Sequence, residues 1–280
     1  MTCRRRPARN RPAGWDAAAD WYVGWVGEFG SEHHRRIAIP AALHLLDVRP
    51  GERVLDVGCG HGVLARPLLD AGAEYTGVDA SPRLIAAAKR SYGSAARFVV
   101  GDATRLADVR ELAGQAVDAA IFLLSIQDMD PLDAAVAGTA RLIVPGGRMV
   151  IVMTHPAFRI PRHSGWGWDE SRKLRYRRVD SYLTEMAIPL SPTAGRPTVS
   201  TTYHRPIEAY VAALADAGLA IDALRELPTF KSARSGPTAK AENAANREFP
   251  LFLALRARKI GAPAPAQPAA SASSRRRRSS

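Results

Sequence analysis

The chain of 280 residues carries 39 Lys and Arg against 27 Asp and Glu, a formal net charge of +12, and is 46% hydrophobic. This length supports one large core, so we expect one domain with an insertion rather than two complete domains. Its two cysteines exclude a disulfide framework and fit a reducing cytoplasm. No apolar run has the length of a membrane span or the form of a signal peptide, so we expect a soluble cytoplasmic protein without a membrane partner.

The excess positive charge lies at the two ends of the chain. Residues 1–11 hold five arginines and residues 275–278 hold four, and removing these nine from the 39 basic residues leaves 30 against 27 acidic ones. We therefore predict disordered basic ends, residues 1–14 and 259–280, flanking a nearly neutral domain over 15–258. Nucleic acid as a partner of these arginines is a less favoured alternative.

The first predicted elements are helices over residues 15–22 and 39–46, followed by the stretch Val54-Leu55-Asp56-Val57-Gly58-Cys59-Gly60-His61-Gly62. This stretch predicts a buried strand, a glycine turn that permits positive φ, and a helix continuing through residue 69. Such a turn at the carboxyl end of a strand is a site for a charged small molecule. A dinucleotide fingerprint would need a third glycine at position 63, where the chain has Val63.

Two further predicted strands, residues 75–79 and 97–102, end in Asp79 and Asp102. Asp79 lies 21 residues after Gly58, the position of a ribose-binding carboxylate. The pattern Asp56-x-Gly58-x-Gly60-x-Gly62 with these two acids resembles the class I (Rossmann-like) S-adenosylmethionine-dependent methyltransferases. The resemblance implies S-adenosyl-L-methionine as cofactor, with Asp79 on the ribose and Asp102 on the adenine amino group. The alternative is that each acid only caps a helix.

The cofactor-binding residues expected from this resemblance come from the glycine turn, the ends of the next two strands and the N-terminal helix. They are Asp56, Gly58, Cys59, Gly60, Gly62, Asp79, Ala80, Asp102, Ala103 and Tyr22.

Strands and helices continue to alternate along the chain, which predicts an α/β fold with a doubly wound, mostly parallel sheet. The resemblance implies seven strands, the last two antiparallel. Residues 155–204 are too long for an ordinary connection, and we predict a small β lid there, inserted after strand five, with strands at 174–177, 182–188 and 198–203. The other predicted elements are a helix from Ser81-Pro82, strands 118–124 and 148–153, helices 131–142 and 207–217, and strands 221–227 and 251–256.

Three side chains are candidates for catalysis: Asp128 after the fourth strand, His155 after the fifth, and His204 at the exit of the lid. Methyl transfer requires the acceptor in line with the methyl carbon and water excluded, and a hydroxyl acceptor benefits from a base. His155 is the preferred base because the pKa of histidine is ordinarily near neutrality. The alternatives are a structural hydrogen-bonding role for His155 and a helix cap for His204.

The predicted lid supplies Trp166, Trp168, Arg175 and Tyr176 as candidates for acceptor binding. Tryptophans beside glycines suit a planar acceptor, and arginines suit a carboxylate or phosphate. The alternatives are tryptophans that anchor the lid and a strand face that is simply solvated.

We therefore predict a transferase that methylates a small molecule, a planar or acidic metabolite, by O-methylation, as a monomer or homodimer. No Cys/His cluster has metal-ligand spacing, so no metal is expected. Residues 125–128 lack the Asn/Asp-Pro-Pro-Tyr/Phe motif, which argues against methylation of amino groups on DNA bases. An RNA or protein methyltransferase that uses the basic ends, and a non-catalytic S-adenosylmethionine-binding protein, are the alternatives.

Overall fold

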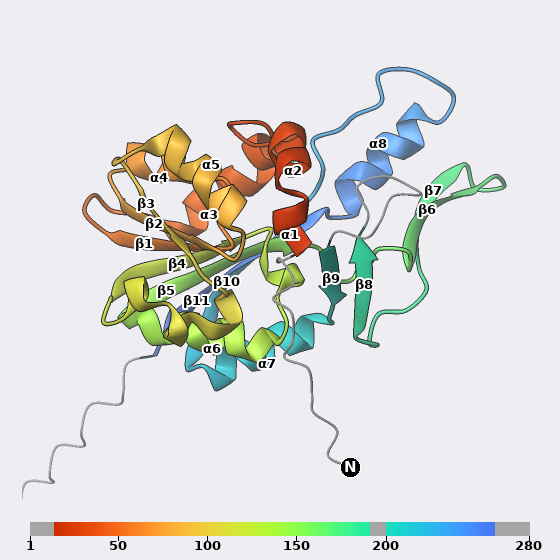
Figure 1. The fold of residues 1–280 in the computed structure, drawn as a ribbon. Coiled ribbons are helices and arrows are strands. Elements are labelled where there is room, and N and C mark those ends of the chain that lie inside the picture. Colours follow the sequence, from red (N-terminus) through yellow and green to blue (C-terminus); the bar gives the residue numbers. More distant parts are fainter. Residues whose placement is uncertain (1–13, 191–199, 261–280) are drawn as a thin grey trace, which may run out of the picture.

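The computed structural model describes residues 14–190 and 200–260 (Figure 1). Its strands in the main sheet are β1 Arg53–Val57, β2 Glu74–Asp79, β3 Arg97–Val100, β4 Val117–Leu123, β5 Ile143–Thr154, β10 Leu219–Leu227 and β11 Phe252–Lys259. They are arranged in the order β10-β11-β5-β4-β1-β2-β3. Strands β1 to β5 are parallel to their neighbours among themselves, and β11 is antiparallel to both β5 and β10. The predicted seven-stranded, mostly parallel sheet with an antiparallel final pair is confirmed.

Helices cover both faces of this sheet, α3 to α5 on one face and α6 and α7 on the other (Figure 1). Side chains alternate between the two faces along β1, and each face has its own hydrophobic core. Val54 packs in the core under α3 to α5, whereas Leu55 and Val57 pack in the core under α6 and α7. Both faces of a parallel sheet are thus buried. The helices are α3 Ile39–Leu46, α4 Ala65–Asp70, α5 Pro82–Tyr92, α6 Leu132–Leu142 and α7 Ile207–Asp216.

The segment before the first strand and the turn after it are less regular than predicted. The N-terminal helix is broken into α1 Gly14–Ala17 and α2 Ala19–Val26, and a π-helical turn, His34–Ala38, precedes α3. The helix expected directly after the glycine turn begins only at Ala65. Gly58, Gly60 and Gly62 all have positive φ, which keeps the intervening backbone out of the helical region.

After β5 the chain forms two short antiparallel pairs, β6 Ser164–Asp169 with β7 Leu174–Val179, and β8 Met186–Leu190 with β9 Ser200–His204. The strand predicted at 182–188 is shifted to β8, and β6 was not predicted. A further unpredicted helix, α8 Ala239–Glu248, packs against β7 (Figure 1). That these pairs act as a lid stays a prediction.

The basic ends fall almost wholly outside the described residues, although β11 extends to Lys259. Over 14–190 and 200–260, no helix combines the length and apolar character required to cross a membrane. The same residues contain no group of three His, Cys, Asp or Glu side chains placed to hold a metal ion.

Candidate functional site

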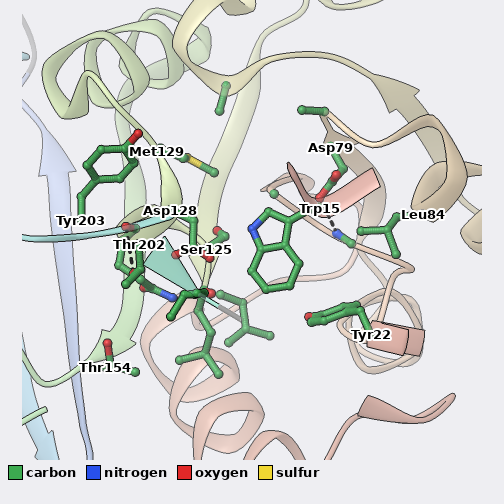
Figure 2. A pocket seen from close by; sticks show the side chains of 18 of the residues that line it. Trp15, Tyr22, Asp79, Leu84, Ser125, Asp128, Met129, Thr154, Thr202 and Tyr203 are labelled. Atoms are coloured by element: carbon green, nitrogen blue, oxygen red, sulfur yellow. Dashed lines mark hydrogen bonds between the residues drawn. The ribbon is translucent and has the colours of Figure 1, made fainter. Parts of the chain in front are cut away.

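A cavity of about 580 Å³ lies at the carboxyl ends of the parallel strands (Figure 2). Open α/β sheets bind ligands at this edge, because the loops after successive strands converge there. The ends of β1 to β4 and the loops that follow them contribute Gly58, Gly60, Asp79, Ala80, Asp102, Ala103, Ser125, Asp128 and Met129, and β5 ends there with Thr154. All of these residues except Ser125, Met129 and Thr154 are site residues predicted from the sequence.

Asp79 is fixed in the cavity wall by the glycine turn. Its Oδ2 accepts a hydrogen bond from the Gly60 N–H at 2.9 Å, and its Oδ1 accepts one from the Ser81 N–H at 2.8 Å. Burial raises the pKa of this carboxyl, and the two backbone N–H groups oppose the rise. Because each carboxylate oxygen has two acceptor sites, both oxygens can still accept a hydroxyl from a ligand.

Asp102 both lines the cavity and caps a helix. Its Oδ1 accepts hydrogen bonds from the Thr104 N–H at 2.9 Å and the Thr104 hydroxyl at 2.7 Å, at the start of the 3-10 helix Ala103–Asp108. Its Oδ2 lies 3.4 Å from Arg105 Nε. The capping alternative therefore describes Asp102, but it does not exclude a ligand contact, since the side chain is also part of the cavity wall.

Three expected cofactor residues lie behind the wall rather than in it. Asp56 is 2% exposed, and its Oδ2 accepts the Tyr75 hydroxyl at 2.8 Å. Burial raises the pKa of Asp56 to about 7. Cys59 is buried beneath the turn, and the Gly62 carbonyl accepts the Tyr92 hydroxyl at 2.9 Å. Asp56, Cys59 and Gly62 therefore do not line the cavity, and their contacts stabilise the glycine turn from behind.

The N-terminal helices close one side of the cavity. Trp15 and Tyr22 line it, with ring centroids 5.3 Å apart in an edge-on arrangement (Figure 2). Asp16 holds this cover in place, because its Oδ1 accepts the Ser81 hydroxyl at 2.7 Å and the Arg83 N–H at 3.0 Å. The cover is therefore attached to the first turn of α5, directly after Asp79.

Asp128 is a titratable side chain of this cavity whose pKa lies near neutrality. It belongs to the 3-10 turn Ile126–Asp128 after β4 and lies near Trp15 and Thr202 (Figure 2). Burial raises the pKa of Asp128 to about 7, and the polar groups of the neighbouring Thr202 and Trp15 side chains oppose this rise. A carboxyl with this pKa exchanges its proton near neutral pH.

The two candidate histidines are not brought to the cavity. His155 is 1% exposed, its Nε2 is 2.9 Å from Glu226 Oε1, and its Nδ1 accepts the Ala157 N–H at 3.2 Å. Burial lowers the pKa of His155, which favours the neutral ring. The Nε2 of His204 is 2.7 Å from the Tyr182 carbonyl oxygen. Both rings therefore serve as structural hydrogen-bonding groups.

Several lining residues were not identified from the sequence as site residues. From the segment after β5 the wall receives Arg159, Thr202 and Tyr203. No spacing in the sequence marks them, because β9 reaches the cavity by packing beside α1 and the turn after β4. Ser125 could have been found, since it follows β4 at the binding edge of the sheet.

The four lid candidates divide into two pairs. Trp166 and Arg175 line a second cavity of about 430 Å³ beside the first. Trp168 donates to Glu170 at 2.6 Å in the hairpin turn, and Tyr176 packs over Gly167 on the other side of β7. Trp168 and Tyr176 line neither of these two cavities.

Comparisons with known proteins agree with this architecture. A family model described as a methyltransferase domain matches residues 54–147. A demethylmenaquinone methyltransferase of Beutenbergia cavernae is 37% identical over 40% of this chain and 44% of the relative. A ubiquinone biosynthesis O-methyltransferase of Alkalilimnicola ehrlichii is 33% identical over 53% of this chain and 61% of the relative. The chain thus spans about half the length of the curated relatives it matches.

The fold also matches a solved structure over most of its length. The crystal structure of an S-adenosylmethionine-dependent methyltransferase from Mesorhizobium loti superposes with a TM-score of 0.61 and 25% identity. The match covers 79% of this chain and 95% of that protein. It therefore extends well beyond the segment matched by the family model.

Proposed function

Since the chain belongs to the class I S-adenosylmethionine-dependent methyltransferases, we propose that it transfers a methyl group to a small molecule bound in the 580 Å³ cavity. One observation carries the proposal: Asp79, Asp102 and Asp128 line the same cavity from the ends of three different strands. Two of these acids suit a nucleoside, and the third suits an acceptor that must lose a proton.

The residues present fit S-adenosyl-L-methionine. The Asp79 carboxylate, held by the Gly60 and Ser81 N–H groups, can accept both ribose hydroxyls. Asp102 and the backbone at Ala103 can hold the adenine edge, and Tyr22 covers the site. The bound cofactor would supply an electrophilic methyl group on a positively charged sulfur. The cavity volume lies within the range of about 300–1,000 Å³ that is usual for small-molecule sites.

We assign the role of base to Asp128, and infer O-methylation from it. An acceptor hydroxyl placed against the Asp128 carboxylate would give up its proton as the oxygen attacks, which is worth about a hundredfold or more in rate. The pKa of about 7 allows the ionised carboxylate to be present at neutral pH. His155, with both ring nitrogens engaged elsewhere, is not needed for this step.

The rest of the lining supports a planar, largely apolar acceptor. The lining includes apolar side chains from several elements, namely Trp15, Leu123, Leu124, Met129, Leu190 and Phe252. Such walls exclude water and position a flat ring without requiring many polar contacts. Relatives named as a demethylmenaquinone methyltransferase and a ubiquinone biosynthesis O-methyltransferase support a small-molecule acceptor.

The test is transfer of a labelled methyl group from S-adenosylmethionine to the separated fractions of a cell extract. We expect label in the small-molecule fraction, and loss of this label with Asp128→Asn. Label only in RNA or protein would replace the small-molecule proposal with the alternative that uses the basic ends. Cofactor binding without transfer to any fraction would favour a binding protein.

A further inference from the structure

The hairpin of β6 and β7 gathers three arginines around one tryptophan. The guanidinium carbons of Arg159, Arg175 and Arg177 lie 5.6, 4.5 and 5.2 Å from the ring centroid of Trp166. Arg175 and Arg177 share one face of β7 because side chains alternate along a strand, and Arg177 is paired with Trp166 across the hairpin. Cation–π contact stabilises each arginine separately, but it leaves their mutual repulsion in place.

Only one carboxylate among the described residues forms an ion pair with these three arginines. Arg175 lies 3.4 Å from Glu242 of α8. Arg177 donates to two neutral oxygens, the Phe158 carbonyl at 2.7 Å and the Ser164 hydroxyl at 2.8 Å. Within the described part of the chain, Arg159 has no ion-pair partner, and its Nε is buried without a hydrogen-bond partner.

Burial adds to the free-energy cost of this arrangement. The pKa of Arg159 is lowered to about 10, first by desolvation and then by the charges of Arg177 and Arg175. Desolvation and Arg175 also lower the pKa of Arg177. Like charges held together in a partly buried cleft are costly unless an anion enters, and such perturbed groups are typical of binding sites.

The second cavity places these charges next to the proposed methyl-transfer site. It is lined by Arg159, Arg175 and Lys231 with Glu242 as its one carboxylate, and Trp166 forms part of the wall. Arg159 lines both cavities, so the two share a wall at this side chain. A ligand whose ring occupies the first cavity can therefore present a polar group to the second.

On the basis of the proposed function, we propose that the second cavity binds an anionic group, carboxylate or phosphate, of the methyl acceptor. Arg159 and Arg175 would then select acidic acceptors over neutral ones. Guanidinium groups match the two oxygens of a carboxylate or phosphate with paired N–H donors, which a solvated lysine patch does not. The acceptor class is thus a flat molecule that bears an acidic substituent.

The test compares aromatic probes that share one phenyl ring and differ in the anionic or neutral group attached to it. Phenyl phosphate, benzoate and neutral phenol are titrated into the full-length protein by calorimetry, with and without saturating S-adenosylhomocysteine. We expect the better of the two anions to bind at least about tenfold more tightly than phenol, the scale of a hydrogen bond to a charged group. Which anion binds more tightly distinguishes a phosphate site from a carboxylate site.

Two variants move the charge of the second cavity in opposite directions. Arg159→Gln should remove most of the preference for the anion, and Glu242→Gln should increase it. Arg172→Gln is the matched control, because Arg172 lies in the same hairpin with a side chain that is 77% exposed. This control should bind all three probes as the wild type does.

The outcomes separate this proposal from the proposed function. Equal binding of anions and phenol, or an anion preference that survives Arg159→Gln, would overturn the anion site even if S-adenosylhomocysteine binds normally. Failure of S-adenosylhomocysteine to bind would instead overturn the methyltransferase function, while the titrations without it would still report on the arginines. A far-UV circular dichroism spectrum and a thermal unfolding midpoint like those of the wild type show that the Arg159→Gln variant is folded.

Discussion

Replacing Asp128 by Asn should stabilise the protein at alkaline pH while it abolishes most of the turnover. The pKa of Asp128 is raised from 3.8 to about 7 in the folded protein. The unfolded chain therefore loses this proton first as the pH rises, and stability falls between about pH 4 and pH 7. Asparagine has the same shape and cannot ionise, so the variant should escape this loss.

The size of the effect follows from the shift. Each pKa unit corresponds to about 1.4 kcal/mol, so a shift of roughly three units sets an upper bound of about 4 kcal/mol on the stability that Asp128 removes when it ionises. We expect about 2 to 4 kcal/mol above pH 8, because relaxation and water in the cavity reduce the penalty. Asp56, whose pKa is also raised to about 7, is present in both proteins, so we expect its contribution to cancel from the difference.

Urea unfolding of wild type and Asp128→Asn at pH 5 and pH 8 measures this difference. The control is Asp133→Asn on the exposed first turn of α6, which should change stability by less than about 1 kcal/mol, and equally at both pH values. Wild-type turnover should rise with pH around a midpoint near 7, and the variant should be about a hundredfold slower or more. A stability difference that does not change with pH, or a variant that keeps wild-type turnover, would refute the assignment of Asp128.

The remaining predictions concern the cover, the buried histidine and the ends. Asp16→Ala removes the side-chain hydrogen bonds from Ser81 and Arg83 that help to attach the cover to α5, so S-adenosylhomocysteine affinity, measured by calorimetry, should fall about tenfold; unchanged affinity would mean that the remaining contacts of Arg83 hold the cover. His155→Ala should lower the thermal midpoint through loss of the Glu226 contact and leave turnover of the folded enzyme nearly unchanged, whereas a large drop in kcat alone would restore His155 as the base. Burial lowers the pKa of His155, so the unfolded chain binds a proton more readily than the folded protein. The free energy of unfolding should therefore also fall as the pH drops below about 6.5. Deleting residues 1–11 and 261–280 should leave binding and small-molecule turnover intact, and a folded truncated protein that lost both would place the basic ends in the site.

The sheet could be predicted because its strands carry strong local signals. Short apolar runs ended by Asp79 and Asp102 mark strands that are buried on both faces, and the glycine turn requires positive φ at Gly58 and Gly60. Two elements lack such signals. Only Ala245 of α8 is buried, so an apolar period is missing and helix-forming composition is the one clue. In β6, Gly165 and Gly167 argue against a strand.

The site was predicted less completely than the sheet, for a different reason. The rule that ligands bind at the carboxyl ends of strands places Asp79 and Asp102 at the edge of the sheet where the cavity lies, because their positions depend only on the chain nearby. His155 also follows a strand, but its side chain turns away from the cavity to Glu226 of β10, 71 residues later. Thr202 enters the wall from β9 through packing that no local pattern records. Tertiary contacts, rather than local propensity, decide these positions.

The most direct test of the account is the affinity of the wild type and of Asp79→Ala for S-adenosylhomocysteine, measured by calorimetry beside a nicotinamide dinucleotide. The account predicts saturable binding of S-adenosylhomocysteine by the wild type and an affinity about 10- to 100-fold lower in Asp79→Ala, the scale of lost hydrogen bonds to a charged group. Preferential binding of the dinucleotide, or an affinity for S-adenosylhomocysteine that Asp79→Ala leaves unchanged, would contradict it.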